Sequence, residues 1–170
     1  VLMAILISPM IVPLIITAAG MFFFYSKIGL THTYLGLILA HTALGTPFVV
    51  ITVTATLTGF DTNLIRASQS LGADTMRTFF KVIMPLILPG VISGGLFAFI
   101  TSFDEVVIVM FIGSVEQITI PKQMWAGLRQ ETSPVILCMA TCLVALSIAL
   151  LTTVEMLRRR SERLRGIKQR

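Results

Sequence analysis

The residues of this 170-residue chain that could best do chemistry are two adjacent carboxylates at the end of a long apolar run, Asp104 and Glu105. A carboxylate in or beside a membrane segment is costly unless it faces protein or water, so such residues often mark a solute path. Two negative charges at the mouth of a path would attract a cationic solute. The alternative is that both are helix-end carboxylates paired with Lys122 or Arg129. We expect Asp104 to face the path and Glu105, three positions past Ser102, to turn toward a neighbouring helix.

Other groups that could do chemistry are sparse. His41 lies inside an apolar run and could relay protons or bind solute, but a hydrogen-bonded structural histidine is the simpler interpretation. Cys138 and Cys142 would share one helix face, yet we interpret them as small core residues rather than as a metal site. The sequence has no GxxxxGK[ST] phosphate-binding loop. We therefore expect no catalytic, cofactor-binding or metal-binding residues in this chain.

Composition indicates the medium that surrounds these residues. Only 12% of the residues are charged, against about 25% in soluble domains, so the chain is predicted to be a membrane protein. Its apolar runs reach the roughly 20 residues that cross a bilayer. The predicted spans are about 1–25, 34–58, 86–113 and 134–156. We therefore predict an all-α fold, a polytopic transmembrane helical bundle that forms one domain over residues 1–170.

Two of these spans carry further signals. Pro9 and Pro13 predict that the first span is kinked and packed against neighbouring helices. The third span has small residues at intervals of four, which place them on one helix face and favour close helix packing in lipid. These residues are Gly90, Gly94, Ala98 and Ser102. Residues 115–133 are predicted to form a loop, in which Trp125 is typical of a membrane interface.

A polar stretch, residues 61–84, separates the second and third spans, and we call it the insert. Its apolar residues recur at helical spacing, but the pattern is broken at Gly72. This predicts a short helix over 62–71, a left-handed turn at Gly72, and a second helix that begins with Asp74 as its N-cap and leads into Pro85. An amphipathic insert between spans must lie at the membrane surface or in a partner's groove, so we interpret it as a docking element.

The basic residues predict the orientation of the chain. Seven of its thirteen Lys and Arg residues lie in the tail, 157–170, and three more lie in the insert. The remaining three, Lys27, Lys122 and Arg129, fall on the opposite side when four spans are counted. The ten-to-three bias places the insert and the basic tail in the cytoplasm. Charge concentrated behind a span also argues against nucleic-acid binding, despite the net charge of +5.

The insert resembles the EAA loop of ABC-importer permease subunits, the MetI-like family, and the resemblance covers essentially the whole chain. The residues that carry it are Arg66, Ala67, Ser68, Leu71, Gly72, Ala73, Phe79 and Pro85. The family usually has Glu-Ala-Ala where this chain has Arg66-Ala67-Ser68. The resemblance implies the C-terminal part of a six-span permease of the bacterial inner membrane. It implies no enzyme activity, because a cytoplasmic ATPase subunit, docked on the insert, would hydrolyse the ATP.

The stretch Ser102-Phe103-Asp104-Glu105 and the later IPKQMWAGLRQETSP resemble the PotC-like polyamine permeases. This implies transport of spermidine or putrescine, with a dimeric ATPase, a second permease subunit and a periplasmic or lipid-anchored solute-binding protein as partners. A related importer for iron(III), thiamine or an opine-like amino compound is the alternative within the same class. A secondary transporter or channel fragment is the alternative from another class, but His41 is its sole mid-span proton-carrying candidate.

Overall fold

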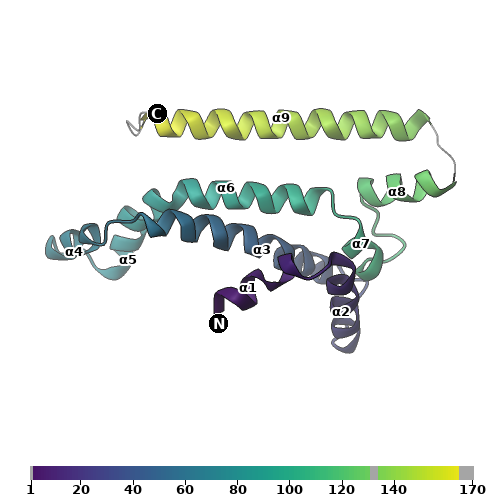
Figure 1. Cartoon of the computed structure of the whole chain (residues 1–170), viewed down its shortest axis with the longest axis horizontal. Helices are drawn as coiled ribbons and strands as arrows, with labels where there is room; N and C mark the ends of the chain where they lie inside the picture. Colours follow the sequence, from purple (N-terminus) through teal and green to yellow (C-terminus); the bar gives the residue numbers. More distant parts are fainter. Residues whose placement is uncertain (1, 131–133, 165–170) are drawn as a thin grey trace. The chain divides into compact units, whose positions relative to one another are not determined.

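The computed structural model of the protein describes residues 2–130 and 134–164, and every regular element in these ranges is a helix (Figure 1). The predicted all-α helical bundle is therefore confirmed. The elements in chain order are α1 Leu2–Ile11, α2 Leu14–Lys27, α3 Tyr34–Thr58, α4 Asn63–Ser70, α5 Thr75–Thr78, the π-helical η1 Phe79–Ile83, α6 Met84–Phe103, α7 Val107–Ile112, α8 Ile120–Gln130 and α9 Pro134–Leu164. They form two compact units, Val1–Ile118 and Thr119–Arg170.

Three of the described helices are long and apolar enough to cross a membrane. They are Tyr34–Thr58, Thr75–Phe103 and Pro134–Thr153. The first predicted span is broken rather than kinked, because α1 and α2 are bent by 112° where they meet. Pro13 has no N–H to donate and an extended backbone (φ −52°, ψ 131°), and a proline disfavours helix in the residue before it. The pair is either a broken span or a re-entrant segment.

The prediction of one helix over 86–113 is corrected in the same way. Helix α6 ends at Phe103, and α7 is a separate short helix that begins at Val107. The Glu105 side chain stabilises the break, because its Oε1 accepts a hydrogen bond from the backbone N–H of Ile108 at 2.9 Å. This bond satisfies one of the N–H groups that every helix start leaves without an intrahelical partner.

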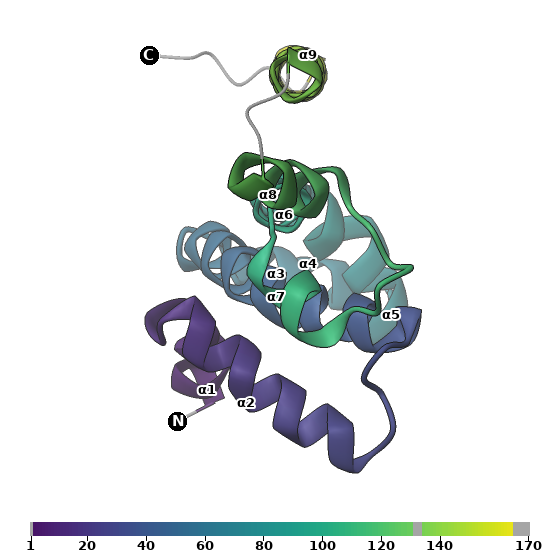
Figure 2. The same ribbon diagram turned by 90° about the vertical axis from the view of Figure 1, so that its right-hand side faces the viewer.

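The core of the first unit lies where α2, α3 and α7 meet (Figure 2). Its buried members are Ala18, Tyr25, Ala40, Leu44, Ile108 and Ile112. Helix α7 supplies three of the largest fully buried side chains, Ile108, Val109 and Ile112. The loop before α3 also holds α7, since His32 donates its backbone N–H to Ile112 O at 2.8 Å and its Nδ1 lies 3.2 Å from Gly113 O.

In the second unit, α8 packs on α9. The predicted loop over 115–133 is therefore corrected, because Ile120–Gln130 is helical. Helix α9 continues beyond its apolar part to Leu164, so the basic tail begins as helix, and residues 165–170 lie outside the described residues. Cys138 and Cys142 are exposed on α9, and the expected core packing of these two residues is wrong within this chain.

Candidate coupling and solute sites

The antiparallel pair α3 and α6 is the frame that carries both candidate sites. The four small residues predicted on one face of α6 lie against α3. A Cβ added at Gly90 would meet Thr56 Oγ1, and one added at Gly94 would lie 2.7 Å from Val49 Cα. The two backbones are therefore so close that a methyl group does not fit between them.

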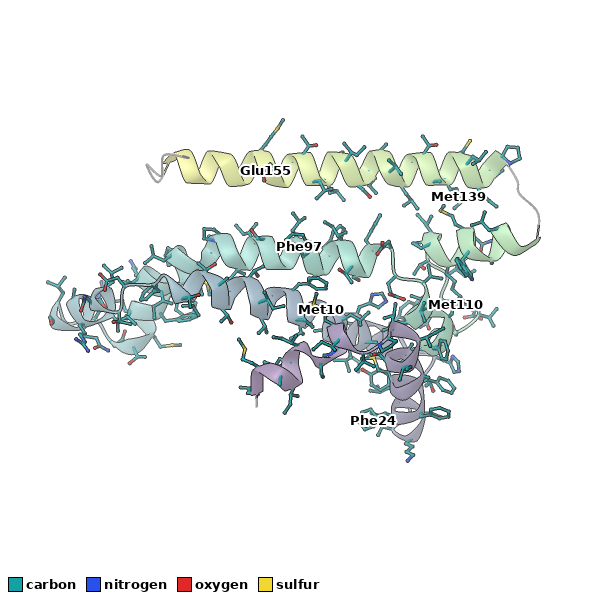
Figure 3. The ribbon with its side chains drawn as sticks, in the orientation of Figure 1. Met10, Phe24, Phe97, Met110, Met139 and Glu155 are labelled. Atoms are coloured by element: carbon teal, nitrogen blue, oxygen red, sulfur yellow. The ribbon has the colours of Figure 1, made fainter. Side chains whose placement is uncertain are left out.

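The same face continues toward the C-terminal end of α6. Ala98 lies opposite Gly45 of α3, where an added Cβ would be 2.8 Å from the Ala98 Cβ. One turn further, Ser102 Oγ lies 2.8 Å from His41 Nδ1, within hydrogen-bond distance. This partner fits the structural interpretation of the mid-span histidine. Phe97, labelled in Figure 3, stacks on Phe48 at a centroid distance of 6.4 Å beside this interface.

The turn of the insert follows directly from Gly72. Helix α4 ends at Ser70, and Gly72 has φ +82°, as predicted for a left-handed residue after a short helix. Gly72 donates its N–H to Gln69 O at 2.9 Å, and Ala73 donates to Ser68 O at 3.1 Å. These two bonds form a Schellman motif, which satisfies carbonyls at the end of α4 and returns the chain toward α5.

Two polar contacts fix the second half of the insert. Asp74 is the predicted N-cap, and its Oδ1 accepts a hydrogen bond from Arg77 N at 2.7 Å. Ser68 Oγ lies 2.9 Å from Thr78 Oγ1, and Thr78 is only 2% exposed. An alanine at position 68 could not make this bond. Ser68, a departure from the family pattern, thus joins α4 to α5, and the sequence offered the two hydroxyls without indicating that they meet.

The insert and the span form one continuous helix, Thr75–Phe103. Pro85 cannot donate to the carbonyl four residues earlier, and the π-helical turn η1 precedes it, with Met84 donating to Phe79 O. A π-turn is a common way for a helix to accommodate such a defect without ending. Displacement of the insert would therefore act directly on α6.

The outer surface of the insert carries apolar and cationic side chains that nothing else in the first unit covers. Leu71 is 88% exposed, and three other large apolar residues of the insert are more than two-fifths exposed. We call these four residues the insert surface: Leu64, Leu71, Met76 and Phe80. Arg66, Ala67 and Arg77 are also exposed, whereas Phe79 and Pro85 are half-buried.

The two carboxylates lie at the other end of α6 and point to different surroundings. Asp104 is exposed at the C-cap of α6, whereas Glu105 is 7% exposed and caps α7. The described partner of Glu105 is therefore a backbone N–H. Helix α6 has 20 residues, so at 1.5 Å per residue about 30 Å separates the insert from Asp104. Figure 1 shows α4 and α5 at one end of the α3–α6 pair and α7 at the other.

Comparison with known proteins gives a consistent result. A family model described as "Binding-protein-dependent transport system inner membrane component" matches residues 1–163. The spermidine/putrescine transport system permease protein PotC of Haemophilus influenzae is 30% identical over 152 residues, which cover 89% of this chain and 59% of that protein. PotC of Escherichia coli K12 is 29% identical over 150 residues, with coverages of 88% and 57%. The putrescine transport system permease protein PotI of the same strain is 28% identical over 145 residues, with coverages of 81% and 51%. The chain spans little more than half the length of these relatives.

Proposed function

We propose that this chain, which belongs to the family of binding-protein-dependent transport system inner membrane components, forms half of a solute path through the inner membrane. We further propose that it couples that path to a partner ATPase. One observation carries this proposal. The helix Thr75–Phe103 begins inside the exposed insert and ends beside Asp104. A partner that binds the insert surface can therefore move the element that reaches the far end of the path.

The insert is the element we assign to ATPase docking. Its four exposed apolar side chains would be covered in a groove of the ATPase subunit, and the exposed Arg66 and Arg77 favour a groove with an acidic rim. The Schellman turn and the Ser68–Thr78 bond hold α4 in one position relative to α5. A rigid docking element transmits a partner's movement, whereas a flexible one would absorb it.

The side of the membrane follows from charge. Two candidate spans, α6 and α9, separate the insert from the basic tail, so both lie on one side whatever path α1 and α2 take. The ten Lys and Arg residues of the insert and tail support a cytoplasmic location for that side. Asp104 then lies at the outer mouth, where a solute-binding protein, periplasmic or lipid-anchored, would deliver its solute. The other half of the path would come from a second permease subunit, and the ATPase subunits would act as a dimer.

The solute we propose is a polyamine, spermidine or putrescine. The exposed Asp104 carboxylate can attract a cation, and the relatives named above are polyamine permeases. The buried Glu105 would act through α7, because its carboxylate is already engaged by Ile108 N. Importers for iron(III), thiamine or an opine-like compound remain the alternative, and an uptake panel with these solutes separates them.

Asp104→Asn is expected to weaken uptake of labelled spermidine. A hydrogen bond to a charged group contributes about 1.5–3 kcal/mol, so the half-saturating spermidine concentration should rise roughly tenfold or more. The measurement is ATP-driven uptake by the complete transporter in proteoliposomes. Glu116→Gln, which removes the same charge from an exposed site, should leave uptake unchanged. Normal uptake by Asp104→Asn would rule out its path role, and absence of ATP-driven uptake of both spermidine and putrescine by the unaltered transporter would rule out the polyamine assignment.

A further inference from the structure

Helix α8, Ile120–Gln130, is a feature of the second unit that the transport path does not explain. It has an apolar side and a polar side. Since successive helical residues are about 100° apart, Ile120, Met124 and Leu128 fall on one side with Trp125 at its margin. Lys122 and Gln123 fall on the other. The apolar side covers an arc of about 140°, which is typical of a helix at the boundary between two media.

Helix α9 contacts α8 at Gly127, which lies at the margin of this arc. A Cβ added at Gly127 would lie 2.7 Å from Ile136 Cδ1, so the two helices are in close contact at Gly127. Three large side chains of the arc are about half exposed, with Ile120 at 47%, Trp125 at 47% and Leu128 at 56%, whereas Met124 is half-buried. Within the second unit, these three large apolar side chains are therefore only partly covered.

The position of α8 in the chain indicates what covers the arc. Only residues 131–133 separate it from Pro134, where the apolar helix Pro134–Thr153 begins. At 3.8 Å per Cα step, the ends of this link can be no more than about 15 Å apart. The arc is therefore tethered to the level at which α9 enters the lipid. A tryptophan beside a lysine on an amphipathic helix is the composition that suits the headgroup region.

We propose that α8 is an interfacial helix, which lies in the plane of the membrane with Ile120, Met124, Trp125 and Leu128 in the boundary between lipid headgroups and acyl chains. In this position it fixes the depth at which α9 begins. Gly127 is needed because α8 must turn its flank, and not its apolar arc, toward Ile136. The proposal requires that α9 crosses the membrane but does not depend on the transported solute.

Trp125 provides the test, because it is the sole tryptophan of the chain. The 170-residue chain is reconstituted into phosphatidylcholine vesicles that carry bromine atoms either near the headgroup end of the acyl chains or near their tips. We expect most of the emission to be lost with shallow bromines, much less with deep bromines, and little with aqueous acrylamide. Stronger quenching by deep bromines, or quenching by acrylamide alone, would overturn the proposal. No quenching by any of the three would also overturn it and would indicate a protein partner on the arc.

A matched pair of variants tests the orientation of the helix. Leu128→Gln places an amide in the centre of the apolar arc and should reduce quenching by shallow bromines while increasing quenching by acrylamide. Ala126→Gln places the same amide on the exposed opposite side and should change neither. Equal quenching of the two variants would contradict the assignment of the arc to lipid.

Discussion

Gly94→Ala is expected to destabilise the chain, and Gly94→Leu to destabilise it more. A Cβ at this position would meet Thr52 Oγ1 and lie 2.7 Å from Val49 Cα, which is backbone and cannot rotate away. Helices α3 and α6 would have to separate, and overpacking of this kind typically costs about 1–3 kcal/mol. The measurement is the fraction of monodisperse protein that survives heating in detergent, determined by size exclusion.

The neighbouring glycine is the control for this experiment. Gly95 lies in the same helix, and a Cβ added there would have no atom within 4 Å. Gly95→Ala should therefore match the unaltered protein or exceed it slightly, because alanine is the better helix former by about 1 kcal/mol. Equal heat resistance of the Gly94→Ala and Gly95→Ala proteins would show that the α3–α6 contact is looser than described.

Gly72→Val is expected to impair stimulation of the partner ATPase while leaving the spans folded. Gly72 has φ +82°, and a residue with a Cβ costs about 1–2 kcal/mol in the left-handed helical region. Relief of this strain would break the bonds from Gly72 to Gln69 O and from Ala73 to Ser68 O. Helix α4 would then leave its position against α5. A change of this size corresponds to roughly a fivefold or larger loss of the docked conformation.

The measurement is ATPase activity of the complete transporter in proteoliposomes with solute-loaded binding protein. Asparagine tolerates left-handed backbone better than other non-glycine residues, so Gly72→Asn should lose less activity than Gly72→Val. Gly59→Ala should be neutral, because Gly59 has φ −93° and open space around its Cα. Full stimulation by the Gly72→Val protein would contradict the coupling role, and a parallel loss of heat resistance would assign the defect to folding.

Local rules predicted the insert well. Gly72 after a short amphipathic segment, and Asp74 three residues before Arg77, each specify backbone geometry through neighbours in sequence, and both occur as expected. The row of small residues on α6, Gly90, Gly94, Ala98 and Ser102, was also predictable from the sequence, because residues four positions apart lie on one helix face. The residues of α3 that this row contacts were not predictable, since they depend on the register of two helices that the insert joins.

The failed predictions have both local and tertiary causes. The apolar sequence after Asp104 gives no sign that α6 ends, because the break depends on Glu105 reaching Ile108 N. Pro13 signalled a disturbance, but packing of α1 on α3 and of α2 on α7 makes it a 112° bend. Pro121 and Gly127 led us to predict a loop where the structure has α8. Pro121 is in fact in the first turn, where its missing N–H costs nothing, and Gly127 serves the contact with Ile136.

The central claim is that the insert, and not the end with Asp104, binds the ATPase. Two positions test it directly, because Leu71 in the insert is 88% exposed and Val115 beyond α7 is 89% exposed. A photoreactive amino acid is placed at one or the other in the assembled transporter, and crosslinked chains are identified by mass. We predict a crosslink to the ATPase subunit from position 71 and none from position 115. A crosslink to the ATPase from position 115, or from neither position, would contradict the account.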